Sequence, residues 1–228
     1  MSKVAIGSHS SPSRALQLAL DDLGFDFVGR IKQVSNICIV ASDLLLVESL
    51  ISAIKLHTRA NVYVLSNADN QNIVEGSIPR GEEVRMPIRR PKVTMEAEFV
   101  IEIAKMPSDV KRKTEFSIEQ FIYSTWLVPP RSNNSKFTRA HDPWLEGELR
   151  NEVLADVYAQ KPIDLAILDD SNNNAVLVSF DAVAIDSVGM RMLGVDPEDV
   201  GYLSKLYMLG LGTSVLSKID VPLGVIQN

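Results

Sequence analysis

Cysteine is almost absent from this 228-residue sequence, and the single one, Cys38, lies inside an apolar run. A disulfide framework therefore cannot form within the chain, and cysteine thiolates cannot hold an iron–sulfur cluster. Cys38 stands between Ile37 and Ile39, and it has no His or Lys beside it to stabilise a thiolate. We expect this thiol to be buried in a strand, unpaired and unreactive.

Long apolar runs and an excess of positive charge are also missing. No window approaches the length of apolar sequence that a membrane span needs, and residues 1–7 are too short and too polar for a signal peptide. A formal net charge of −6 and a pI near 5.1 argue against broad attraction to nucleic acid or to anionic membranes. We expect a cytoplasmic protein without a membrane or nucleic-acid partner. The basic segments 85–92 and 111–113 then carry charge on solvated loops or edge strands.

Aromatic residues make up only 6% of the chain, whereas 46% of it is hydrophobic, so the expected core is aliphatic. Apolar runs that are typical of strands alternate with segments of helical periodicity, and this order favours parallel strands joined by crossover helices. Strands are predicted over 3–6, 36–41, 61–65, 98–104, 164–168, 175–180 and 219–221, and helices over 14–23, 44–56, 144–158, 182–193 and 196–209.

The predicted fold class is α/β, with a mixed or largely parallel sheet and helices on both faces. We expect residues 1–228 to form a single domain with two irregular excursions, at about 66–92 and 129–143. The first excursion is compatible with a hairpin built around Gly81, and residues 117–128 are ambiguous between helix and strand.

Four acids follow the predicted strands between Lys161 and Gly194, where open α/β sheets place their ligands. They are Asp169, Asp170, Asp181 and Asp186. Converging carboxylates could hold a divalent metal ion through oxygen or serve as acid and base. Structural roles are the alternative, because Asp181 is placed to cap a helix and Asp169 and Asp170 are placed to form a turn.

Asp186 is not explained by a cap or a turn. On a helix it shares the face of Val183, Met190 and Leu193, so we expect it to be buried, with either a hydrogen-bond partner or a raised pKa. A structural hydrogen bond to a neighbouring loop amide and a functional role both stay open. We take Asp186 and Asp169 as candidate catalytic acids, and Asp181 and Asp186 as candidate metal ligands.

The three histidines, His9, His57 and His141, are too far apart in sequence to show a ligand spacing. Ser8, His9 and Ser10 lie between a predicted strand and a helix N-terminus, where backbone N–H groups attract anions. We therefore take these three as candidate ligand-binding residues, although the glycine pattern of a phosphate loop is missing.

The last third of the chain resembles the domain of unknown function 362 family. The residues that carry the resemblance are 161–169, 180–186, 192–194, Tyr202 with Leu203, and 210–212. Upstream, the strand ending in Lys105 and the His141 that precedes a helix are similar to the family pattern. The resemblance implies an α/β fold with a site that includes Lys105 and His141.

Two family motifs are replaced in this chain. Many family members carry Lys-Pro-Asn after the second core strand and Lys-Leu-Lys-Thr-His after a later one, but residues 41–43 and 105–109 differ from these motifs. Many relatives also carry a ferredoxin-like iron–sulfur segment, which a chain with one cysteine cannot form.

Two functions of different class remain. The first is a metal- or small-anion-dependent enzyme or ligand-binding protein, with a site at the strand ends that uses Asp169, Asp181, Asp186, Lys105 and His141. The second is a catalytically degenerate binding or assembly module without metal. The retained acids favour the first and the replaced motifs favour the second, and homo-oligomerisation is left open.

Overall fold

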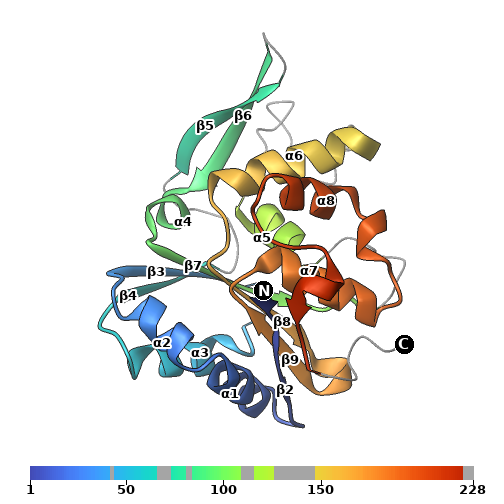
Figure 1. Cartoon of the computed structure of the whole chain (residues 1–228). Coiled ribbons are helices and arrows are strands. Elements are labelled where there is room, and N and C mark those ends of the chain that lie inside the picture. Colours follow the sequence, from blue (N-terminus) through green and yellow to red (C-terminus); the bar gives the residue numbers. More distant parts are fainter. Residues whose placement is uncertain (42–43, 66–72, 81–83, 109–115, 126–146, 223–228) are drawn as a thin grey trace.

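The computed structural model describes residues 1–41, 44–65, 73–80, 84–108, 116–125 and 147–222. Its centre is a six-stranded mixed sheet with the order β2-β9-β8-β7-β3-β4 (Figure 1). The strands are β2 (Ala5–Ser8), β3 (Asn36–Ala41), β4 (Asn61–Leu65), β7 (Phe99–Lys105), β8 (Leu165–Asp170) and β9 (Ala175–Ser179). Strands β4, β3, β7 and β8 are parallel, whereas β9 is antiparallel to both β8 and β2.

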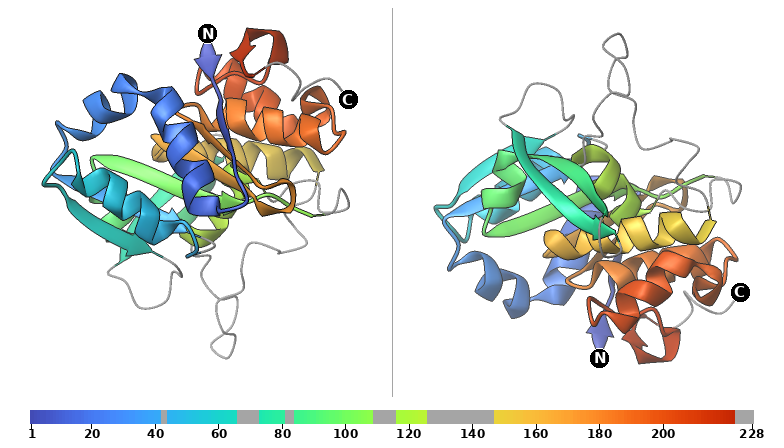
Figure 2. Two further views of the ribbon diagram at one scale, coloured as in Figure 1. Left: turned by 90° about the horizontal axis from the view of Figure 1, so that it is seen from below. Right: turned by 90° about the horizontal axis from the view of Figure 1, so that it is seen from above.

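Helices cover both faces of this sheet, as Figures 1 and 2 show. One face carries α1 (Pro12–Leu23), α2 (Phe25–Ile31) and α3 (Val47–Lys55), and the other carries α4 (Lys92–Glu96), α5 (Ser117–Thr125), α6 (Gly147–Gln160), α7 (Ala182–Met192) and α8 (Gly201–Met208). The predicted α/β class, with a mixed sheet and helices on both faces, is confirmed.

The central strands are mostly apolar because both of their faces are covered, and Glu102 within β7 is an exception. In β3, Ile37 and Ile39 enter the core beneath α1–α3, and Cys38 and Val40 enter the core beneath α4–α8. Cys38 is fully buried and unpaired, as predicted, and burial raises the pKa of its thiol to about 11. Its low reactivity stays a prediction.

Two small sheets lie outside the central one. Strands β5 (Ile73–Arg80) and β6 (Val84–Pro91) pair as an antiparallel hairpin that extends away from the central sheet (Figure 1). The hairpin predicted in this excursion is therefore confirmed, although Gly81 itself lies outside the described residues. Strand β1 (Ser2–Lys3) pairs in parallel with β10 (Ile219–Asp220), which joins the two ends of the chain.

Several helix boundaries differ from the prediction. Within the ambiguous segment at 117–128, the described residues Ser117–Thr125 form the helix α5. Helix α2 follows α1 directly because Gly24, with φ of 57°, ends α1 and allows a new helix to begin. The helix predicted over 196–209 is divided by Val200, whose backbone is extended, into a 3-10 turn over Pro197–Asp199 and α8. The excursion at 129–143 lies outside the described residues. None of the described helices is both long and apolar enough to cross a membrane.

Candidate ligand site at the carboxyl edge of the sheet

Strands β3 and β7 are adjacent and parallel, but the chain continues from each of them toward a different end of the sheet. Strand β3 continues through α3, on one face, to β4 at the edge of the sheet. Strand β7 continues through α5 and α6, on the other face, to β8. This arrangement is a topological switch point, and open α/β sheets bind ligands outside the carboxyl ends of the strands at such a point.

Lys105 and Asp169 lie next to each other beside this switch point. They are partners in the β7–β8 register, so their backbones are separated by about the 4.8 Å that separates neighbouring strands. Asp169 is only 2% exposed, and its Oδ2 accepts a hydrogen bond from Ser171 Oγ at 3.1 Å. The structure thus brings together two of the predicted site residues, one basic and one acidic, on neighbouring strand ends.

Gln120 of α5 fixes the backbone at this position. Its Nε2 donates to the Lys105 carbonyl at 2.7 Å, and its Oε1 accepts from the Lys105 N–H at 3.1 Å. The position of Lys105 at the end of β7 therefore depends on the first turns of α5.

Ser8, His9 and Ser10 lie at the same edge of the sheet but farther along it. The register places Gly7, Val176, Asp169 and Lys105 in one row across four strands, which separates the first from the last by about 14 Å at 4.8 Å per strand. The imidazole of His9 is used locally, because its Nδ1 accepts from the Ser11 N–H at 2.9 Å. These three residues therefore do not adjoin Lys105 directly.

Asp170 has a turn-forming contact. It is 2% exposed, and its Oδ2 accepts from Asn173 Nδ2 at 2.8 Å within the turn that joins β8 to β9. Asn174 completes that turn with φ of 53°. This contact matches the structural alternative for Asp170.

Asp181 lies at the opposite edge of the sheet from Asp169. Its Oδ1 accepts from the Ala184 N–H at 2.9 Å and so caps α7, as the sequence predicts, while its Oδ2 accepts from Ser2 Oγ at 2.6 Å and from the Thr213 N–H at 2.9 Å. The expected gathering of the four acids at one site is not what the structure shows. The reason is that β9 runs antiparallel to β8 and carries the chain back across the sheet.

Asp186 is fully buried and serves as an N-terminal cap for α5. Its Oδ1 accepts from the Ser117 N–H at 2.9 Å and from Ser117 Oγ at 2.6 Å. Its Oδ2 accepts from the Ile118 N–H at 3.1 Å and from the Tyr202 hydroxyl at 3.3 Å. Burial raises the pKa of Asp186 to about 6, although these hydrogen bonds favour the ionised form and act in the opposite direction.

The candidate metal ligands Asp181 and Asp186 point toward different neighbours. Asp181 precedes α7 with an extended backbone and accepts from Ser2 and Thr213, whereas Asp186 lies inside α7 and accepts from donors on α5 and α8. No group of three or more His, Cys, Asp or Glu side chains that could hold a metal ion occurs in the part of the chain that the structure describes. His141, the remaining predicted site residue, lies outside the described residues.

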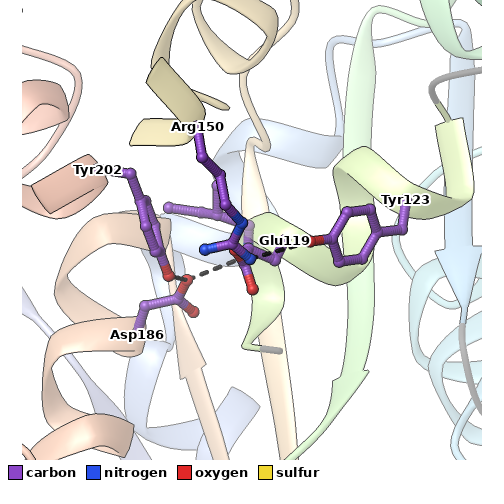
Figure 3. A network of polar contacts seen from close by, with 6 residues as sticks. Glu119, Tyr123, Arg150, Asp186 and Tyr202 are labelled. Carbon is purple, nitrogen blue, oxygen red and sulfur yellow. Dashed lines mark hydrogen bonds and ion pairs between the residues drawn. The ribbon is translucent and has the colours of Figure 1, made fainter. Parts of the chain in front are cut away.

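A buried polar cluster that sequence reasoning missed adjoins Asp186 (Figure 3). Arg150 of α6 points toward α5, where it forms an ion pair with Glu119 and donates to the Tyr123 hydroxyl at 3.0 Å. Glu119 is 0% exposed, and the side chain of Arg150 is 23% exposed. Glu119 and Tyr123 lie on α5, whereas Arg150 lies on α6, 31 residues after Glu119, so no local pattern links the arginine to its partners.

Glu102 in the middle of β7 is the most unusual acid in the structure. It is fully buried, and neither carboxylate oxygen has a hydrogen-bond partner among the described residues. Burial, together with the nearby Asp186 carboxylate, raises the pKa of Glu102 well above its usual value. An acid in the otherwise apolar strand Phe99–Ala104 was a visible signal in the sequence, but it was not recognised.

Comparison of the chain with protein-family models found no match, and comparison with curated proteins found none either.

Proposed function

We propose that this protein binds a small anionic molecule at the carboxyl edge of its sheet, with Lys105 and Asp169 as the groups that contact it. The observation that carries the proposal is the pairing of these two residues on adjacent strand ends beside the β3–β7 switch point. No other described pair of predicted site residues combines opposite charges at this edge.

The two side chains offer complementary chemistry. The compact ammonium of Lys105 suits a phosphate or carboxylate group. The carboxylate of Asp169 accepts hydrogen bonds from a hydroxyl or amine of the same ligand, and it could accept a proton if the ligand reacts. A substrate with an anionic group close to a hydroxyl or amine fits both residues.

The second candidate function is a catalytically degenerate binding or assembly module. Its support is that Asp181 and Asp186 are engaged by main-chain amides and hydroxyls that stabilise the fold. The replaced motifs at 41–43 and 105–109 favour the same view, if the chain is a divergent relative of the domain of unknown function 362 family, which we also propose from its last third.

The test is titration of the protein with inorganic phosphate and a panel of small hydroxycarboxylates, followed by calorimetry and amide NMR. We expect shifts at residues 105–106 and 169–171, and we expect Lys105→Met and Asp169→Asn to lose them. The matched control is Lys92→Met, which removes an exposed ammonium whose ion pair among the described residues is with Glu96, four residues away.

A parallel titration with Mg²⁺ or Mn²⁺, alone and after chelation, separates the two candidates. Anion binding that requires the divalent ion supports the metal-dependent enzyme, and anion binding without it supports a simple anion site. If none of these anions shifts the edge residues, or if Lys105→Met binds like the parent, the proposed site is refuted and the assembly module is favoured.

A further inference from the structure

Three buried carboxyl groups share the layer between the sheet and helices α5–α8. They are Glu102 of β7, Glu119 of α5 and Asp186 of α7. Glu119 is paired with Arg150, and Asp186 has four hydrogen-bond donors. Glu102 has neither a cation nor a donor among the described residues.

An ionised carboxylate without any donor is very costly to bury, so a group in this position keeps its proton. Glu102 is therefore a neutral carboxylic acid in the folded protein. Its ionisation would add a second negative charge beside Asp186, in a region that water does not reach.

Helix α5 connects this acid pair to the carboxyl edge. Its first two residues, Ser117 and Ile118, donate to Asp186, and one residue past the buried Glu119 it carries Gln120, which holds both backbone groups of Lys105. A change in how α5 packs therefore reaches the backbone of Lys105 directly.

We propose that Glu102 makes the hold of α5 on Lys105 proton-dependent, so that loss of the proton from this acid loosens the first turn of α5. The inference concerns the regulation of the proposed anion site and rests on that proposal only for its functional consequence. The proton-linked movement of α5 stands without it.

The direction of this pH dependence follows from the burial of Glu102. A charge on Glu102, which has no donor among the described residues, is relieved when the helix opens to water, so opening becomes easier as Glu102 ionises. Among the described residues, the charged and titratable groups around the pair are Cys38 from β3, Glu119 from α5, Arg150 and Tyr158 from α6, and Tyr202 from α8. Of these, Arg150 is committed to Glu119 and Tyr123, and burial raises the pKa values of Cys38, Tyr158 and Tyr202, so they stay neutral near pH 7.

The test is hydrogen exchange at the amides of Ser117, Ile118 and Lys105, each corrected for its intrinsic rate, from pH 4 to pH 9 without any ligand. The opening constants should rise toward alkaline pH as Glu102 loses its proton. Glu102→Gln should remove this rise, because the amide cannot ionise.

The matched control is Glu96→Gln on α4, which neutralises an acid whose side chain is 63% exposed and should leave the profile unchanged. If Glu102→Gln fails to fold, the carboxyl ¹³C resonance of Glu102 in the parent protein gives the same answer, since it must be that of a protonated acid at pH 7. Opening constants that do not change with pH, or an ionised Glu102 at pH 7, would overturn the inference. Because no ligand is present, such a failure would leave the anion site untested by this measurement and still open to the titration above.

Discussion

Replacing Asp186 with alanine should destabilise the protein, and the loss should be larger in acid than at neutral pH. The carboxylate accepts hydrogen bonds from the Ser117 and Ile118 amides and from the Ser117 and Tyr202 hydroxyls. An alanine leaves the two amides buried without an acceptor, at a cost of about 1–3 kcal/mol for each group. The hydroxyls can rotate toward other acceptors and add less.

The buried charge offsets part of this loss at neutral pH. The pKa of Asp186 rises from 3.8 to about 6 on folding, which corresponds to about 3 kcal/mol of stability that is present below pH 3.8 and is lost as the pH rises through 6. Asp186 therefore stabilises the parent protein more at pH 4 than at pH 7. We expect Asp186→Ala to lower the free energy of unfolding by about 1–4 kcal/mol at pH 7. At pH 4 the decrease should be larger by about 2–3 kcal/mol.

Urea unfolding followed by circular dichroism at both pH values measures this difference. Asp186→Asn keeps one acceptor oxygen and removes the buried charge, so it should lose less than the alanine variant at pH 7. The control is Asp199→Ala, an exposed acid, which should change the free energy of unfolding by less than about 0.5 kcal/mol. An alanine variant as stable as the parent at both pH values, or one that loses more at pH 7 than at pH 4, would refute the reasoning.

Three further predictions concern packing, reactivity and the buried ion pair. Gly7→Ala should lower the melting temperature sharply, because a Cβ there would lie 1.8 Å from the Ala15 carbonyl oxygen of α1; a variant that melts like the parent would contradict this close approach. Cys38 should react with a thiol reagent only as fast as the protein unfolds, since its thiol is fully buried with a pKa of about 11, and rapid labelling of the native protein would disprove this. Arg150→Met should cost about 2–4 kcal/mol in urea unfolding, because it removes the cation that pairs with the buried Glu119, and a variant as stable as the parent would contradict this.

Local patterns predicted the elements whose signals lie within a few residues. The expected strands at 36–41 and 61–65 match β3 and β4, because a short apolar run between polar residues indicates where a strand begins and ends. The cap at Asp181 and the left-handed stop at Gly194 were also predicted, since both depend on the backbone of the neighbouring turn.

Interactions between residues far apart in sequence determined the remaining features of the fold and of the candidate site. Residues 117–128 carry an apolar pattern that fits either helix or strand, and packing against β7 and capping by Asp186 select the helix. Because β9 is antiparallel to β8, Asp181 lies at the opposite edge of the sheet from Asp169. No residue close in sequence to either acid determines how these two strands pair. The pairing of Lys105 with Asp169, 64 residues apart, and the isolation of Glu102 beneath α5 likewise exist only once the layers have packed. A sequence shows which side chains prefer burial and where the backbone turns, but the partner of each buried group depends on how separate elements share one core.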